Sequence, residues 1–251
     1  MSVLPILWRN MKWRFHNAFT IVITILQPML WLILYSSVAG QSMKGIGIEN
    51  YTGFILPGLF VLVTFSSCSS GGIMNYLMKT DGSFYRVLIA PVKRTSIVLG
   101  QLLEAVCCTF IEIGIMLLVS IFFSVEIASG FVGFLFIILI IFLMAFFMAG
   151  LTYSISLILP NEVIYETVLN AIILPIFFLS TALFPVDTLT GGLKIAVNLN
   201  PFTHVINVLR LLILQKTVDF DAILYVSIML FAMGCMSFLW ALHRLQKETK
   251  L

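Results

Sequence analysis

The chain has 251 residues, of which 61% are apolar and 10% are charged, and its mean hydropathy is +1.11. Soluble domains carry charge on roughly 25% of their residues, so this composition excludes an ordinary soluble domain and indicates an integral membrane protein. The net charge of +3 is small, and the apolar runs leave no room for a separate soluble domain of about 50 residues or more. We therefore expect residues 1–251 to form a single membrane domain.

The first predicted element is a short amphipathic helix at the N-terminus. Its apolar side chains recur at helical spacing, at Leu4, Leu7, Trp8, Met11 and Phe15. Arg9, Lys12 and His16 lie away from this stripe. The pattern predicts an interfacial helix on the inner leaflet, with Trp8, Arg9 and Lys12 as its candidate contact residues. The alternative is a simple basic anchor that flanks the first span.

The same basic residues followed by an apolar run also resemble a secretory signal, with Ser37-Val38-Ala39 in the place of a cleavage site. We expect no cleavage, because the run 18–39 is longer than the usual signal core of about 7–15 residues. Gln27-Pro28 in its middle is expected to kink the helix instead.

Six apolar segments reach the length of about 20 residues that a spanning helix needs. They are 18–39, 53–74, 96–124, 131–159, 163–184 and 223–242. Six crossings put both termini on one side. With the termini inside, the inner residues are Arg9, Lys12, Arg14, Lys79, Arg86, Lys93, Arg94, Arg244, Lys247 and Lys250, and the outer ones are Lys44, Lys194, Arg210 and Lys216. This excess of inner Lys and Arg predicts cytoplasmic termini in an inner membrane.

Between the second and third spans, residues 82–100 form a basic, half-apolar segment too charged to enter lipid. Apolar residues recur at helical spacing on one side, at Phe84, Val87, Leu88 and Pro91, while charge is supplied elsewhere by Arg86, Lys93 and Arg94. This is the pattern of a short amphipathic helix that faces water and a partner. Pro91 disfavours the helical conformation at the preceding residue, so the helix should end there.

Two carboxylates fall inside the third span, about 12 Å apart along its axis. Acids within a membrane are costly and are candidates for function. Glu112 is the deeper one, and it either lines a substrate path or binds a proton or cation, or it is a protonated or paired structural residue at a helix interface. Glu104 is shallower, and we expect it to reach water on the inner side.

The second span carries the run Ser-Ser-Cys-Ser-Ser-Gly-Gly at 66–72. Small residues let helix backbones approach closely and supply hydroxyls for hydrogen bonds between helices. Close packing is therefore one interpretation, and a polar substrate lining with Ser66 and Ser70 is the other.

Between the fifth and sixth spans, the apolar run 205–214 is too short to cross a membrane and is interrupted by Arg210. Breaks at Pro185 and at Asn200-Pro201 divide this region into short helical pieces. Non-helical backbone at membrane depth survives only where protein or a water-filled cavity covers it. We expect a re-entrant, outward-facing cap.

The chain contains no GxxxxGK[ST] sequence, so it has no P-loop that could bind a nucleotide. His16, His204 and His243 are far apart in the sequence, and the acids do not gather near them, so no metal site is predicted. Because no assembled set of catalytic roles is visible, we expect no enzymatic activity. The four cysteines fall in apolar runs and are interpreted as packing residues.

Two motifs give the chain a resemblance to the ABC-2 type transporter permease family, the membrane subunits of ATP-driven exporters. Residues 82–95, GSFYRVLIAPVKRT, with Gly100 following, are similar to the family segment between spans two and three. Residues 178–185, FLSTALFP, followed by 200–203, NPFT, and Arg210, are similar to its fifth span and outer cap. The chain departs from the family at Thr181, where glycine is frequent, and at 190–192, where Pro and Trp are common.

The resemblance implies that the first motif is a coupling helix, which seats in a groove of a separate ATPase while the N-terminal helix helps to grip it. The implied interface residues are Phe84, Tyr85, Arg86, Leu88, Ala90 and Pro91. It also implies two permeases, as a homodimer or a heterodimer, with two ATPase subunits that hold ATP and magnesium. This chain would hold no cofactor, and its partners would include membrane lipids but no nucleic acid.

The few polar residues of the bundle suggest a lipid-like, amphipathic or hydrophobic cargo, such as a drug, peptide, lipid or lipid-linked glycan. One alternative is a self-sufficient secondary transporter or ion pathway that uses Glu112. Another is a structural or immunity protein that transports nothing.

Overall fold

The computed structural model describes residues 3–16, 22, 26, 28–34, 51–123, 125, 127–183 and 191–248. Within these ranges the secondary structure is entirely helical, which confirms the predicted all-α class. The helices are α1 (Val3–His16), α3 (Tyr51–Thr80), α4 (Ser83–Ile89), α5 (Arg94–Ile121), α6 (Gly130–Ile158), α7 (Glu162–Phe178), α8 (Gly192–Leu199), α9 (Pro201–Leu214) and α10 (Phe220–Glu248).

Four described helices, α3, α5, α6 and α10, are long and apolar enough to cross a membrane. The bent pair α8 and α9, whose axes meet at 77°, is either a broken fifth crossing or a re-entrant loop. The predicted first span lies largely outside the described residues. α7 has 17 residues and ends three residues after Pro175, well before the predicted end at 184. Six crossings therefore stay a prediction.

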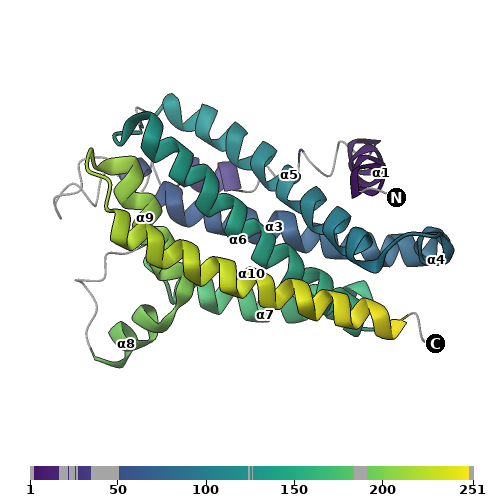
Figure 1. The fold of residues 1–251 in the computed structure, drawn as a ribbon. Coiled ribbons are helices and arrows are strands. Elements are labelled where there is room, and N and C mark those ends of the chain that lie inside the picture. Colours follow the sequence, from purple (N-terminus) through teal and green to yellow (C-terminus); the bar gives the residue numbers. More distant parts are fainter. Residues whose placement is uncertain are drawn as a thin grey trace.

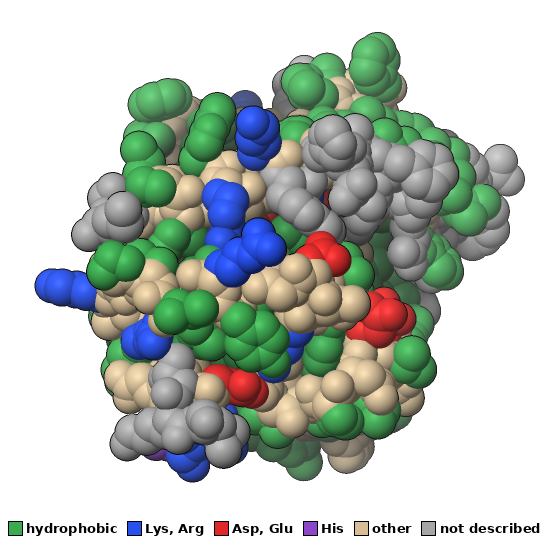
Figure 2. Space-filling model, turned by 90° about the vertical axis from the view of Figure 1, so that its right-hand side faces the viewer, with side chains coloured by type: hydrophobic (Ala, Val, Ile, Leu, Met, Phe, Trp, Pro, Cys, Tyr) green, Lys and Arg blue, Asp and Glu red, His purple; other side chains and the backbone are tan. Residues whose placement is uncertain are grey.

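The long helices run side by side and give the molecule two distinct ends (Figure 1). α1, α4 and the C-terminal end of α10 gather at one end, and α8 and α9 lie at the other. This places the N- and C-terminal helices at the same end, as any even number of crossings between them requires. Lys and Arg side chains are prominent on the first of these ends (Figure 2), which we call the basic end.

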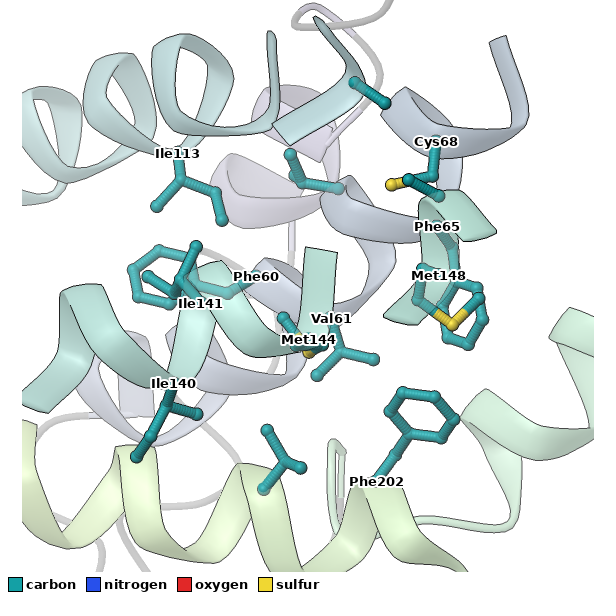
Figure 3. Packing of buried hydrophobic residues seen from close by; sticks show 14 of the residues in the cluster. Phe60, Val61, Phe65, Cys68, Ile113, Ile140, Ile141, Met144, Met148 and Phe202 are labelled. Atoms are coloured by element: carbon teal, nitrogen blue, oxygen red, sulfur yellow. The ribbon is translucent and has the colours of Figure 1, made fainter. Parts of the chain in front are cut away.

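The core lies between α3, α6 and α9. Ile141 and Met144 of α6 and Phe60 of α3 belong to one buried cluster, in which the rings of Phe65 and Phe202 are 4.9 Å apart (Figure 3). The most apolar 18-residue stretch of α3 is 83% buried, whereas that of α10 is only 28% buried. α3 is therefore the central helix, and the outer helices turn apolar faces outward, as expected of helices in contact with lipid.

The run of small residues at 66–72 packs closely against α6 and α7. The Thr152 hydroxyl donates to the Cys68 carbonyl at 3.0 Å, and the Tyr165 hydroxyl donates to the Ser69 carbonyl at 3.0 Å. A Cβ atom at Gly72 would overlap the Tyr165 hydroxyl, so only glycine allows this approach. These contacts show close packing at Cys68, Ser69 and Gly72.

Candidate functional site

The short helix α4 protrudes at the basic end between α3 and α5. Gly82 precedes it with φ of +69°, a conformation that glycine adopts readily. The helix ends at Ile89, and Ala90 is extended with ψ of 148°, as predicted from the proline that follows. The Arg94 guanidinium donates to the Leu88 carbonyl at 2.8 Å, which fixes the end of α4 to the start of α5.

The apolar side of α4 faces the bundle, contrary to the prediction that it faces a partner. Phe84 is 4% exposed, and Leu88 is partly buried against the core. The outward side carries Tyr85 (56% exposed) and Ile89 (82% exposed), together with exposed Arg86. Of the remaining predicted interface residues, Pro91 is exposed and Ala90 is half-buried. The exposed surface of α4 and the residues that follow it is thus formed by Tyr85, Arg86, Ile89 and Pro91, of which the sequence analysis did not name Ile89.

Lys79, at the C-terminal end of α3, connects α4 to the last helix. Its ammonium lies 5.3 Å from the centre of the Phe84 ring and 3.4 Å from the Glu248 carboxylate of α10. Because this pair is partly exposed, it contributes little stability. It does place the end of α10 beside α4, the helix that the family resemblance identified as the candidate coupling helix.

α1 is held against α5 by one apolar and two polar contacts on successive turns. Ile6 packs on Gly100, and one turn further the Asn10 amide donates to the Gln101 side chain at 3.0 Å. The next turn places the Arg14 guanidinium 2.9 Å from the Glu104 carboxylate. α3 takes part as well, because Gln101 donates to its Gly71 carbonyl at 3.3 Å. The sequence correctly indicated an amphipathic helix here, but its docking on α5 was not foreseen.

Glu104 is only 1% exposed and is paired with Arg14. The expectation that it reaches water is therefore wrong. Burial lowers the pKa of the Arg14 guanidinium, but the Glu104 carboxylate raises it, and the resulting pKa lies above the ordinary value. The two groups lie 2.9 Å apart and are almost completely buried, so the contact is a buried ion pair.

The predicted contact residues of α1 lie on its outer side. Trp8 is 73% exposed, and Arg9 and Lys12 are exposed as well. They share the basic end with α4 (Figure 1). The structure thus brings the predicted interfacial helix α1 and the predicted coupling helix α4 to one end of the molecule.

The predicted pathway residues lie within the bundle. Glu112 is 2% exposed and lies near enough to Arg14 to belong to the polar surroundings of the Arg14–Glu104 pair. Ser66 and Ser70 are half-buried on α3. A role in transport stays a prediction for all three. Among the described residues, no group of three or more His, Cys, Asp or Glu is arranged to hold a metal.

At the opposite end, Asn200 joins α7 to α9. Its side-chain oxygen accepts from the Phe202 amide at 3.0 Å and caps α9, while its nitrogen donates to the carbonyls of Ile176 and Leu179 at 2.7 and 2.8 Å. Pro201 occupies the first helical position, where proline is favoured. Pro185, the other predicted cap residue, lies outside the described residues.

Arg210 is half-buried in the protein rather than presented to solvent. It donates to the carbonyls of Phe54 at 3.0 Å and Thr181 at 2.6 Å, and it stacks on the Phe54 ring at 3.7 Å. It thereby ties α9 to α3 and to the turn after α7. Near this end, an apolar hollow of about 690 Å³ opens between α3, α5, α6 and α9, with Leu56, Leu117, Phe134 and Ile213 in its wall.

Comparison with known proteins gives a consistent picture. The model of a family described as ABC-2 type transporter matches residues 2–214. A protein described as a transport permease, ycf38, from Cyanophora paradoxa is 29% identical over 218 residues, which cover 84% of this chain and 73% of the relative. Its counterpart from Porphyra purpurea is 26% identical over 194 residues, which cover 76% and 66% of the two chains.

A more distant relative is the daunorubicin resistance ABC transporter permease protein DrrB1 from Streptomyces coeruleorubidus. It is 21% identical over 207 residues, which cover 81% of this chain and 71% of the relative. The predicted interfacial helix α1 and the predicted coupling helix α4 both fall within the range that the family model matches.

Proposed function

This chain is a transport permease that belongs to the ABC-2 type transporter family, and from that premise we propose that it is the membrane subunit of an ATP-driven exporter. The energy comes from two separate ATPase subunits, which hold ATP and magnesium. The chain itself is non-catalytic and pairs with a second permease, most simply as a homodimer. Six spans cross an inner membrane, with both termini in the cytoplasm.

The observation that carries this proposal is the position of α4. Its outward surface of Tyr85, Arg86, Ile89 and Pro91 stands at the basic end, beside the exposed side of α1. Tyr and Arg are enriched among the residues that dominate protein interfaces, and the exposed Ile89 adds apolar surface beside them. A cytoplasmic ATPase would dock on this surface.

The contacts of α4 supply a route for mechanical force. Phe84 inserts into the bundle beside Lys79 of α3, and Arg94 binds α4 to α5. Since α1 is fixed to α5 through Gln101 and Glu104, a push on α4 reaches α1, α3 and α5 together. ATP-driven closure of the ATPase pair would in this way move the spanning helices.

The cargo that fits this chain best is amphipathic or hydrophobic. The hollow of about 690 Å³ lined by Leu56, Leu117, Phe134 and Ile213 has the size of a small-molecule site and an apolar wall. The name of the relative from Streptomyces coeruleorubidus supports a drug-like cargo. Transport runs out of the cytoplasm or the inner leaflet.

The docking surface is tested by a charge and polarity reversal on α4. Arg86→Glu with Ile89→Asp should lower co-purification of the ATPase with the tagged permease by about tenfold or more, because both side chains face outward. The matched control is Lys194→Glu with Ile195→Asp, which makes the same exchange on exposed residues of α8 at the other end. Equal recovery of the ATPase from both variants would refute the assignment.

The second candidate is transport without an ATPase, and the burial of Glu112 in α5 is the observation in its favour. Transport assays in liposomes that contain this chain alone distinguish the two candidate functions. Cargo transport driven by an ion gradient, and lost in Glu112→Gln, would replace the exporter proposal, whereas transport that needs the added ATPase and ATP supports it.

A further inference from the structure

An apolar hollow of about 490 Å³ lies between α1 and α5 at the basic end. Its wall is formed by Leu7, Trp8, Met11 and Phe15 of α1 and by Cys107 of α5, and Lys12 is its charged member. These residues belong to the stripe that the sequence assigned to an interfacial helix. Trp8 and Lys12 also belong to the exposed side of α1 beside the proposed ATPase surface, but that proposal assigns no ligand to the hollow itself.

The charges around the hollow favour an anion. α1 contains no acidic residue, and Arg14 is neutralised by its buried pairing with Glu104. Arg9 and Lys12 remain exposed, and Lys12 lines the hollow itself. A ligand that matches this arrangement has an apolar chain and an anionic head.

The surroundings of the hollow are those of a lipid surface. Leu4 and Trp8 are 72% and 73% exposed on the same helix, and a helix with an apolar stripe and exposed cations lies in the headgroup region of a membrane. Anionic lipids attract basic residues at that depth. Ile6, Asn10 and Arg14 anchor α1 to α5 on a neighbouring face of α1, and the hollow lies beside these contacts with Cys107 of α5 in its wall.

We propose that this hollow binds one acyl chain of an anionic phospholipid, whose phosphate pairs with Lys12. The lipid is a resident ligand rather than cargo, so the site goes beyond the exporter assignment and does not depend on an ATPase. It would hold α1 at a fixed depth in the inner leaflet, beside the surface on which α4 stands.

The test is native mass spectrometry of the full chain after incubation with vesicles of phosphatidylcholine alone or of phosphatidylcholine mixed with phosphatidylglycerol. We expect retained phosphatidylglycerol on the wild type and about a fivefold loss in Lys12→Gln, the effect of one cation near an anionic surface. Lys12→Arg keeps the charge and should keep the lipid. Lys93→Gln, which removes an exposed cation at the same end, is the matched control and should change nothing.

A second variant tests the chain-binding part of the hollow. Cys107→Phe fills the hollow from the α5 side without altering charge, so it should lower the retention of both lipids. Equal retention of the two lipids by the wild type, or identical retention by Lys12→Gln and Lys93→Gln, would overturn the proposal. So would a Cys107→Phe variant that shifts the oligomeric state but keeps the lipid, since a second copy of the chain would then be the occupant.

Discussion

At the scale of single residues, the Arg14–Glu104 pair is the contact on which the position of α1 depends most. Each side chain is almost completely buried, and the guanidinium also donates to the Ser67 carbonyl at 3.4 Å. A buried ion pair gains little over an apolar pair of the same shape, but removing one partner leaves an uncompensated charge. The pair therefore acts as a requirement for a particular docking of α1 rather than as a net source of stability.

We expect Glu104→Gln to destabilise the protein by about 3–5 kcal/mol, because Arg14 would stay buried without its counter-charge. The double variant Arg14→Met with Glu104→Leu should recover most of that loss, since both charges are then absent. Thermal unfolding of the purified protein in detergent measures both. A single variant no less stable than the double one would show that the pair is not buried as described.

Individual residues also show what could be read from the sequence and what could not. Pro91 fixed the end of α4 because proline restricts its neighbour locally. Glu104 was misjudged because its partner Arg14 lies 90 positions away and on another helix. The polar residues Asn10 and Arg14 lie four positions apart on α1, and this spacing is the signal that could have revealed a second, inward-facing stripe.

At the scale of elements, the structure differs from the sequence prediction mainly in which side of a helix packs against the bundle and which side is exposed. Periodicity showed that α4 has an apolar side, but it does not say whether that side meets the bundle or a partner. Burial of Phe84 settles the matter for the isolated chain. Four of the spanning helices were predicted well because length and composition decide them, whereas the end of α7 depends on tertiary contacts with Asn200.

The junction of α7 and α9 gives a prediction with a natural control. Asn200→Ala removes a helix cap and leaves the carbonyls of Ile176 and Leu179 without their donor, so we expect a loss of about 2–3 kcal/mol. Asn161→Ala removes a cap of the same kind at the start of α7, where Asn161 accepts from the Ile164 amide at an exposed position. That change should cost about 1 kcal/mol.

Amide hydrogen exchange along α9 distinguishes the two variants. The first turns of α9 should exchange faster in Asn200→Ala and be unaffected in Asn161→Ala. Faster exchange of α9 in both variants, or in neither, would mean that Asn200 does not anchor this helix.

At the scale of the whole molecule, the distribution of Lys and Arg between the two ends is the feature on which the proposed orientation in the membrane rests. α1, α4 and the end of α10 share one end with exposed Arg86, Lys93 and Lys247, while Lys194 and Lys216 are exposed near the other. Cytoplasmic segments of membrane proteins are enriched in Lys and Arg. An ATPase can reach α4 only if the basic end is the cytoplasmic one, so the proposed function requires this orientation.

Cysteine labelling of intact cells tests this orientation directly. In a background without native cysteines, a membrane-impermeant maleimide should label Lys194→Cys and Lys216→Cys from outside, but should reach Arg86→Cys and Lys247→Cys only after the membrane is opened. Labelling of Arg86→Cys in sealed cells would place α4 on the wrong side for a cytoplasmic ATPase and would end the exporter proposal. Labelling of Lys247→Cys alone would place the end of α10 on the other side of the membrane from α4, and would contradict the contact of Lys79 with both Phe84 and Glu248.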